Sequence, residues 1–476
     1  MLYIDGKWVQ ASDGKTFIVT NPATGETLGQ VADGGKEDTR MAIEAAHRAF
    51  PAWSALPAKE RAQYMMEAVQ IMRQRIERLA ETITKEMGKP LREARSEIQM
   101  GLEYLEWYAE EGKRVYGDTI PASTANKRLL VLKQPVGVVA AITPWNFPFS
   151  MITRKIAPAI AAGCTVVLKP APATPLTAIA IFEAFEKAGF PPGVVNLITS
   201  DRATEVGEEL MSNPLVRKIT FTGSTAVGKL LMKQAADTMK KVSFELGGHA
   251  PFIVFEDADL EKAAEGVIAS KFRNAGQTCI CTNRIYVHEQ VAEPFGAILT
   301  DKVKALRLGN GLDEATQIGP LINQAALDKV DQHVRDAVEK GAQVLCGGSR
   351  WLEGEGAKGY FYQPTLLMNV KKSMRIAQEE TFGPVAPIFV FRDEEEVIRE
   401  ANDTRYGLAA YFYTRDLSRA IRVMEALEYG IVGVNDPVPT TVQAPFGGVK
   451  ESGIGREGGK YGIEEYLEEK FVSIGL

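Results

Sequence analysis

The sequence has few cysteines and few histidines for its length, with four of each in 476 residues. Four cysteines (Cys164, Cys279, Cys281 and Cys346) do not make a disulfide framework in so long a chain, and this count favours a reducing compartment. Residues 1–8 resemble a strand with an Asp-Gly turn, and neither a signal peptide nor a transit sequence. We therefore expect a cytoplasmic protein.

Long apolar runs and blocks of one charge are also missing. The longest nearly apolar run, residues 156–168, has 13 residues and is too short to cross a bilayer. The formal net charge of −6 is well mixed along the chain and forms no basic stripe, so we expect neither nucleic-acid nor membrane binding. A chain that is 45% apolar and 24% charged, at this length, predicts two or three globular domains with large cores.

Residues 36–116 read as helical, with long amphipathic stretches at 58–87 and 91–108, and a short strand pair is expected around 128–133. Strands and helices then alternate, which predicts a parallel sheet with helices on both faces and ligands beyond the carboxyl ends of its strands. The expected strands are 136–142, 165–168, 194–198 and 218–222, and the expected helices are 151–162, 175–188, 203–211 and 227–236.

A second alternating stretch predicts a second α/β domain. Its expected strands are 251–254, 285–288, 343–346, 386–391 and 411–413. Residues 468–474 resemble a strand that either pairs with 128–133 of its own chain or adds to the sheet of another subunit.

Cys279 stands out chemically. The segment before it, Asn274-Ala275-Gly276-Gln277-Thr278, is small and polar, so a substrate can approach the backbone closely. A thiolate is a strong nucleophile, and Glu245, at an expected strand end beside two glycines, supplies a candidate base. A cysteine and a glutamate with no histidine near either indicate acyl chemistry outside the cysteine–histidine hydrolases.

Three of the strand-end loops, with one later turn, hold further candidates. Gly223 and Ser224 open a helix and offer a phosphate site, although an ordinary strand-to-helix turn is about equally expected. Lys169 is able to reach a ribose or phosphate, or is a solvated loop residue. Asn146 is able to donate to an oxyanion beside Cys279, or only forms a turn. Glu380 can bind ribose hydroxyls, or belongs to an acidic surface turn.

Taken together, six ordered motifs resemble the aldehyde dehydrogenase superfamily over nearly the whole chain. They are 144–148 (PWNFP), 221–225 (FTGST), 245–248 (ELGG), 276–279 (GQTC), 380–384 (ETFGP) and 445–448 (PFGG). The resemblance implies a Rossmann-like NAD(P)-binding domain (1–117 and 136–247), a catalytic domain (248–445), and a small β oligomerisation element with the C-terminal tail (118–135 and 446–476). It also implies a homo-oligomer, dimer or tetramer.

The resemblance also implies residue roles. Cys279 would attack an aldehyde, Asn146 would hold the oxyanion, and Glu245 would activate the water that hydrolyses the thioester. The presence of Glu245 argues against relatives that pass the acyl group to coenzyme A. The implied cofactor residues are Trp145, Lys169, Pro172, Gly223, Ser224, Leu246, Glu380 and Phe382, and no metal is expected.

Within the superfamily, residues 248–252, 271–274, 279–281 and 455–462 are most similar to the succinate-semialdehyde dehydrogenase branch. Arg154, eight residues after Asn146, and Arg273, six before Cys279, would clamp the distal carboxylate of a short semialdehyde. Each charge-assisted hydrogen bond contributes roughly 1.5–3 kcal/mol. Two surface arginines paired with glutamates are the alternative.

Several points differ from that branch or stay open. Thr440 stands where the branch often has a serine ligand, and Pro172 stands where NAD-preferring members often carry a glutamate. No arginine replaces that glutamate, so NAD is slightly favoured over NADP. Cys281 either forms a reversible disulfide with Cys279 or is a small buried thiol; a one-residue spacer is tight for disulfide geometry.

The sequence thus predicts NAD(P)-dependent oxidation of succinate semialdehyde or a close acid semialdehyde. The alternatives within the family are a broad enzyme or one acting on glycolaldehyde, lactaldehyde, glutarate semialdehyde or 2-oxoglutarate semialdehyde. Outside it, the alternatives are a thiol esterase and an inactive structural protein on the same fold.

Overall fold

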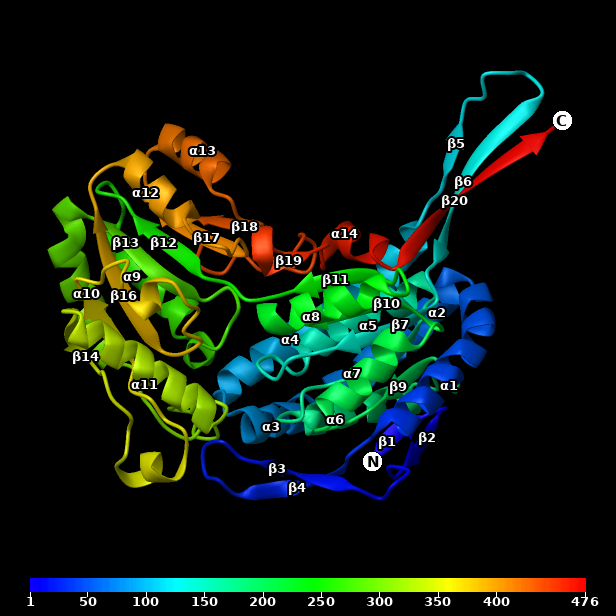
Figure 1. Ribbon diagram of the computed structural model, residues 1–476, viewed down its shortest axis with the longest axis horizontal. Helices are drawn as coiled ribbons and strands as arrows, with labels where there is room; N and C mark the ends of the chain where they lie inside the picture. The colour runs from blue at the N-terminus through cyan, green and yellow to red at the C-terminus, as the bar shows by residue number, and fades with distance from the viewer.

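The computed structural model describes all residues from 1 to 476. It contains two large sheets, a three-stranded arm and a two-stranded ribbon (Figure 1). The first sheet runs, in spatial order, β19 (Gly453–Ile454), β11 (Lys241–Glu245), β10 (Val216–Thr222), β7 (Val138–Ile142), β8 (Thr165–Lys169), β9 (Val195–Leu197), β1 (Leu2–Ile4) and β2 (Lys7–Val9).

The strands from β11 to β9 are parallel, as the alternation of strands and helices predicts. Both edges, however, carry antiparallel strands that this pattern did not indicate: β19 beside β11, and β1 with β2 beside β9. Asp5 and Gly6, between β1 and β2, both have positive φ, which is the backbone of a two-residue hairpin turn. The expected N-terminal strand and Asp-Gly turn are confirmed.

Helices cover both faces of the first sheet. Alternate residues of β7 point to opposite faces: Val139 and Ala141 join one core, and Val138 and Ala140 the other. The first core is closed by α2 (Ala58–Arg73), α3 (Ile76–Met87), α4 (Leu91–Glu111), α5 (Ser150–Ala162) and α6 (Pro175–Lys187). The second is closed by α1 (Lys36–Ala55), α7 (Ala203–Ser212) and α8 (Thr225–Ala236).

The stretch 58–87 is divided into two helices, where the periodicity predicts one. Arg75 leaves the helical region with φ −122° and ψ 18°, so the chain turns between α2 and α3. Both helices pack on α4 and α6. Neither proline nor glycine stands at the break, and we attribute it to packing that local sequence does not report.

The second sheet runs β14 (Gln343–Cys346), β15 (Thr365–Met368), β16 (Val385–Phe391), β13 (Thr282–His288), β12 (Ala250–Val254), β17 (Ala409–Tyr413) and β18 (Ile431–Val434). Its neighbours are parallel except β14 and β15. Its helices are α9 (Leu260–Lys271), α10 (Ala292–Lys304), α11 (Gln324–Glu339), α12 (Glu394–Asn402) and α13 (Leu417–Ala426). The second α/β unit is therefore present.

The arm projects from the body and ends near the C-terminus (Figure 1). Its central strand β6 (Lys127–Pro135) pairs with β5 (Asp118–Ile120) and, along its whole length, with β20 (Leu467–Gly475). The C-terminal strand thus pairs within its own chain, which is one of the two expected arrangements. The short helix α14 (Gly459–Glu464) leads into β20, and the ribbon consists of β3 (Thr16–Thr20) and β4 (Thr27–Ala32).

Short 3-10 segments complete the secondary structure: Gly112–Arg114, Glu289–Val291, Gly354–Lys358, Arg375–Ala377 and Lys450–Ser452. A further tight turn, Arg273–Gly276, contains left-handed backbone. None of the helices combines the length and the apolar character that a membrane span requires.

Candidate active site

Cys279 lies between two cavities and lines both. One, of about 470 Å³, is mostly apolar with several charged groups and is called here the substrate cavity. The other, of about 360 Å³, follows the carboxyl ends of strands β7, β10 and β11 and is called the cofactor cavity. Parallel strands present their carboxyl ends at one edge of a sheet, which is where ligands bind in such folds. A thiol at this junction can meet groups held in either cavity.

The segment before Cys279, residues 272–278, is called the nucleophile loop, and its backbone is strained. Asn274, Ala275 and Gly276 follow one another in the left-handed region, with φ of 53°, 54° and 75°. A Cβ on Gly276 would meet the Gly383 carbonyl oxygen at 2.2 Å, so only glycine fits there. The strained turn sets the direction in which the loop delivers Cys279.

The buried side chain of Gln277 ties this loop to the second α/β unit. Its Oε1 accepts a hydrogen bond from the Ile322 backbone N–H at 3.0 Å. Its Nε2 donates to the carbonyls of Asn274 at 3.1 Å and Pro320 at 3.3 Å. With every polar atom of that amide bonded, the loop is held in place before any substrate arrives.

Burial raises the pKa of the Cys279 thiol to about 12. Arg154 lowers it, while Glu245 and Glu380 raise it further, since negative charge nearby disfavours a thiolate. Cys279 is therefore a neutral thiol at pH 7 in the cofactor-free protein. Its attack on a carbonyl requires that a base take the proton.

Glu245 is the last residue of β11 and is buried, and its Oε2 has no hydrogen-bond partner. Burial and the nearby carboxylate of Glu457 raise its pKa well above the usual range, although Arg154 and Lys155 oppose this. Glu245 lines neither cavity, but its charge reaches the Cys279 thiol. A carboxyl with a raised pKa is suited to accept a proton near neutral pH.

Asn146 lies in the loop after β7, residues 143–149, called here the oxyanion loop, and lines the cofactor cavity beside Cys279. Its Nδ2 donates to the Gln277 carbonyl at 3.0 Å. An amide nitrogen carries two hydrogens, so the second remains available. The oxyanion loop thus brings a free N–H to the cavity that Cys279 shares.

Six of the predicted cofactor residues line the cofactor cavity: Trp145, Gly223, Ser224, Leu246, Glu380 and Phe382. The Phe382 ring meets Trp145 edge-on, with centroids 5.6 Å apart, and Phe382 has a left-handed φ of 56°. Ser224 caps the start of α8, accepting the Val227 N–H at 3.4 Å. That helix start offers N–H groups and a partial positive charge to a phosphate.

Glu380 is held at this cavity by the Gly248 backbone N–H, which donates to its Oε1 at 3.0 Å. Burial raises the pKa of Glu380 to about 7. Its Oε2 forms no hydrogen bond or ion pair within the protein and lies close to Gly247, where a Cβ would meet it at 3.1 Å. A half-buried carboxylate beside glycine suits a sugar diol, so the residues fit a dinucleotide here.

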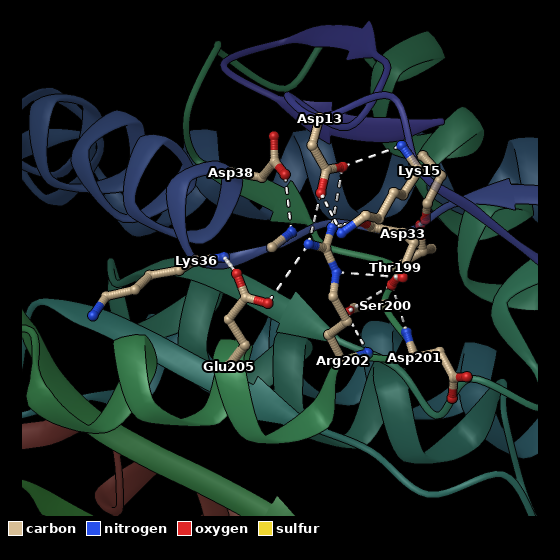
Figure 2. Close-up of polar contacts among 12 residues, drawn as sticks. Asp13, Lys15, Asp33, Lys36, Asp38, Thr199, Ser200, Asp201, Arg202 and Glu205 are labelled. Atoms are coloured by element: carbon tan, nitrogen blue, oxygen red, sulfur yellow. Dashed lines mark hydrogen bonds and ion pairs between the residues drawn. The ribbon is translucent and has the colours of Figure 1, made fainter.

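Lys169, at the end of β8, lines neither cavity. Its Nζ donates to the carbonyls of Pro170 at 3.4 Å and Ser200 at 3.3 Å. Asp33 holds the loop after β9, accepting from Ser200 Oγ at 3.2 Å and from the Asp201 N–H at 2.9 Å (Figure 2). Burial lowers the pKa of Lys169 to about 8, and Asp201 and Asp33 oppose this shift.

The loop after β9, whose Ser200 carbonyl accepts from Lys169, carries an ionic network that the sequence did not indicate. Arg202 extends between Asp13, Asp33 and Glu205, linking the N-terminal segment to the start of α7 (Figure 2). Pro172, near Lys169 and half-buried, likewise lines neither cavity.

Arg154 lines the substrate cavity, but its guanidinium is already paired. Its Nε lies 2.5 Å from Glu457 Oε2, both side chains are 4% exposed, and its Cζ lies 4.2 Å from the centre of the Phe446 ring. Glu457 also pairs with the buried Lys155. In the predicted carboxylate clamp, the charge of Arg154 is therefore largely balanced by Glu457 within the protein.

Glu457 and Lys155 were not among the predicted site residues. Every residue of α5 is buried, and it contains the adjacent cations Arg154 and Lys155. Buried cations need a carboxylate partner. The two adjacent cations on an otherwise apolar helix could have indicated a buried carboxylate partner. No sequence pattern, however, identifies that partner, which lies about 300 residues away.

Arg273 also lines the substrate cavity, and it forms no ion pair. Its Cζ lies 5.0 Å from the centre of the Phe147 ring, and the residue is half-buried. Thr440 lines the same cavity, and its buried Oγ1 has no hydrogen-bond partner. Arg92, which the sequence analysis did not single out, lies on this wall as an exposed residue.

Cys281 is fully buried and lines neither cavity. Lys271 Nζ lies 3.2 Å from its Sγ, and the thiol contacts the Thr282 carbonyl at 3.4 Å. All four cysteines are free thiols. The disulfide with Cys279 stays a prediction. No group of three or more His, Cys, Asp or Glu side chains is arranged to hold a metal ion.

Comparisons with known proteins agree over nearly the whole length. A family model described as "Aldehyde dehydrogenase family" matches residues 8–472. The chain is 57% identical to succinate-semialdehyde dehydrogenase [NADP(+)] of Escherichia coli (strain K12), covering 99% of this chain and 97% of that protein. It is 56% identical to glutarate-semialdehyde dehydrogenase of Pseudomonas putida (strain KT2440), over 100% and 97%. The crystal structure of succinate-semialdehyde dehydrogenase from Burkholderia pseudomallei superimposes with a TM-score of 0.98 at 52% identity, covering 100% of this chain and 98% of that one.

Proposed function

The chain belongs to the aldehyde dehydrogenase family, and we propose that it oxidises succinate semialdehyde, or a close ω-carboxylated aldehyde, to the dicarboxylic acid with NAD(P). The observation that supports this substrate class is Arg273, an arginine free of ion pairs in the same cavity as Cys279. The hydroxyl of Thr440 lacks a partner in that cavity and supplies a second group for a carboxylate. Relatives named for succinate and glutarate semialdehyde at 57% and 56% identity agree with this class.

In this proposal Cys279 loses its proton to solvent and attacks the aldehyde carbon as the thiolate, and the Asn146 amide donates to the resulting oxyanion. A dinucleotide held by Trp145, Glu380 and Phe382 in the cofactor cavity would supply the hydride acceptor, and loss of the hydride from the thiohemiacetal would leave a thioester on Cys279. Glu245 then takes a proton from water, the water attacks the thioester, and the thiolate of Cys279 leaves. Arg273 and Thr440 hold the distal carboxylate, so that the aldehyde end reaches the thiol.

The Arg273→Met variant should raise KM for succinate semialdehyde about 10- to 100-fold and change that for propionaldehyde less than about threefold. The physical reason is loss of one or two charge-assisted hydrogen bonds of about 1.5–3 kcal/mol, which only the carboxylated substrate makes. Steady-state NAD(P)H formation with both aldehydes measures the ratio.

Arg415→Met, at an exposed arginine in the turn before α13, is the matched control and should change neither substrate. Arg154→Met is expected to slow both substrates, because it leaves the buried Glu457 without one of its two cations. Equal losses on the charged and uncharged aldehydes in Arg273→Met would refute the carboxylate clamp. Ester hydrolysis without NAD(P)H formation in the wild type would point instead to a thiol esterase.

We propose that the enzyme accepts NADP as well as NAD. Pro172 supplies no carboxylate to repel a 2′-phosphate, and the Escherichia coli relative is named for NADP. Because the pKa of Lys169 is about 8, its favourable charge is present below that pH and is lost above it. The ratio of kcat/KM for NADP to that for NAD should therefore fall between pH 7 and pH 9. A ratio that is constant or rises would contradict a role for Lys169 at the 2′ position.

We also propose that the arm joins copies of this chain. Ile120, Leu132, Phe471 and Ile474 are apolar and 42–62% exposed on its three strands. Exposed apolar side chains clustered on one element mark an interaction surface. Light scattering should give a dimer or tetramer, and Phe471→Asp should shift it toward monomer. A wild-type monomer would contradict this proposal.

A further inference from the structure

We propose that Lys89, Glu93 and Glu97, at the start of α4, are positioning residues that align the oxyanion loop with the nucleophile loop. Lys89 lies just before α4, and the two glutamates lie one turn apart within it. None of the three contacts the Cys279 thiol through a hydrogen bond. This inference rests on the proposed function, and it explains what sets the position of the Asn146 amide relative to Cys279.

Lys89 and Glu97, the latter on the wall of the substrate cavity, both bond to the oxyanion loop. Glu97 Oε1 accepts the backbone N–H groups of Phe149 at 2.7 Å and Ser150 at 3.2 Å. Its Oε2 pairs with Lys89 Nζ at 2.5 Å, and both side chains are 0% exposed. Lys89 Nζ also donates to the Asn146 backbone carbonyl at 2.8 Å. The Lys89–Glu97 ion pair therefore holds the oxyanion loop on both sides of Phe147.

Glu93 holds the nucleophile loop in the same way. Its Oε2 accepts the Asn274 backbone N–H at 2.8 Å. The Asn274 side chain then donates through Nδ2 to the Asn146 carbonyl at 3.0 Å and to the Gln277 carbonyl at 3.2 Å. The two loops, 128 residues apart in sequence, thus meet at the single carbonyl of Asn146, which accepts from both Lys89 and Asn274.

We expect these contacts to fix the relative position of the two loops rather than to increase the stability of the fold. A buried ion pair often contributes nothing beyond what apolar residues of the same volume would contribute. A displacement of about 1 Å at a reacting group, by contrast, can lower a rate about 10²-fold. The backbone of Asn146 is bonded so that its side-chain amide, with one N–H still free, stays aimed into the cavity shared with Cys279.

The test is the double variant Lys89→Met/Glu97→Gln, which removes both charges together and keeps an acceptor for the Phe149 N–H. With NADP⁺ and succinate semialdehyde, the single-turnover rate of NADPH formation should fall about 10- to 100-fold, while KM for the aldehyde changes less than about threefold. Deuterium on the aldehyde carbon should slow that step in the variant. The matched control is Lys85→Met/Glu81→Gln, an exposed ion pair on α3, which should leave the rate unchanged.

A role through Asn146 predicts a strongly non-additive result. In an Asn146→Ala background the double variant should cost less than about threefold more, because the amide that it positions is gone. The same fold-loss in both backgrounds would overturn the inference. Glu93→Gln, which retains an acceptor for the Asn274 N–H, gives a milder test with an expected 3- to 10-fold loss, and it decides the question if the double variant does not fold.

A wild-type protein that oxidises no aldehyde would refute the proposed function. An active wild type whose Lys89→Met/Glu97→Gln variant keeps its single-turnover rate would refute only the positioning role.

Discussion

The Cys279→Ala variant is expected to lose aldehyde oxidation altogether, by about 10⁴-fold or more, while still binding NAD(P). The thiol forms the covalent bond on which every later step depends, and no other cysteine lines either cavity. Steady-state NAD(P)H formation measures the loss, and quenching of tryptophan fluorescence by the dinucleotide measures binding. Cys346→Ala, at a half-buried thiol on β14, is the control and should remain fully active.

The protonation of Cys279 gives this prediction a second measurement. With a pKa of about 12, the fraction of thiolate in the cofactor-free protein rises about tenfold per pH unit below that value. Carbamidomethylation of Cys279 by iodoacetamide, followed by mass spectrometry, should therefore be slow at pH 7 and still be rising at pH 9. A rate that levels off below pH 8 would mean a pKa near neutrality, and residual turnover above about 1% in Cys279→Ala would exclude this residue as the nucleophile.

The Glu245→Gln variant should complete one hydride transfer per active site and then stall, with steady-state turnover reduced about 10²–10⁴-fold. Glutamine keeps the shape of the side chain but does not accept a proton from water, so the thioester on Cys279 persists. A stopped-flow burst of NAD(P)H followed by a slow phase is the kinetic signature, and intact-protein mass spectrometry should find the acyl group on Cys279.

Hydroxylamine should restore turnover in Glu245→Gln, because this nucleophile attacks a thioester without needing a base to activate it. Since burial and Glu457 raise the pKa of Glu245, the base form accumulates only as pH increases, and deacylation in the wild type should accelerate with pH accordingly. Glu81→Gln on α3 makes the same chemical change at an exposed site and should have no effect. Loss of the burst itself in Glu245→Gln would show that Glu245 is needed before hydride transfer, at the activation of Cys279.

The alternation of strands and helices was enough to predict both α/β units, because parallel crossovers alternate elements locally along the chain. It did not predict β19, since a two-residue strand has no periodicity of its own and exists only because β11 offers it a partner. The break between α2 and α3 was missed for a similar reason. It lies at Gln74 and Arg75, residues that are compatible with a continuous helix.

The residue types at the candidate site were predictable, and their partners were not. Cys279, Asn146 and Glu245 stand in short motifs whose chemistry is local, and the structure brings Cys279 and Asn146 to one cavity, with Glu245 near enough for its charge to raise the pKa of the thiol. From the sequence, Arg154 and Arg273 were both predicted to bind the distal carboxylate of the substrate. The structure separates them, because Glu457 pairs with Arg154 and no carboxylate pairs with Arg273.

By itself, the sequence indicated the family, a candidate nucleophile and base, and the alternation of strands and helices in the two α/β units, since each depends on residues that are neighbours along the chain. Only the tertiary structure decided which charges are free, as with Arg273, and which side chains hold others in position, as with Lys89, Glu93 and Glu97. The physical reason is that the partner of a buried charge is chosen by proximity after folding. That proximity joins residues as distant as Arg154 and Glu457, whose separation along the chain carries no periodic signal.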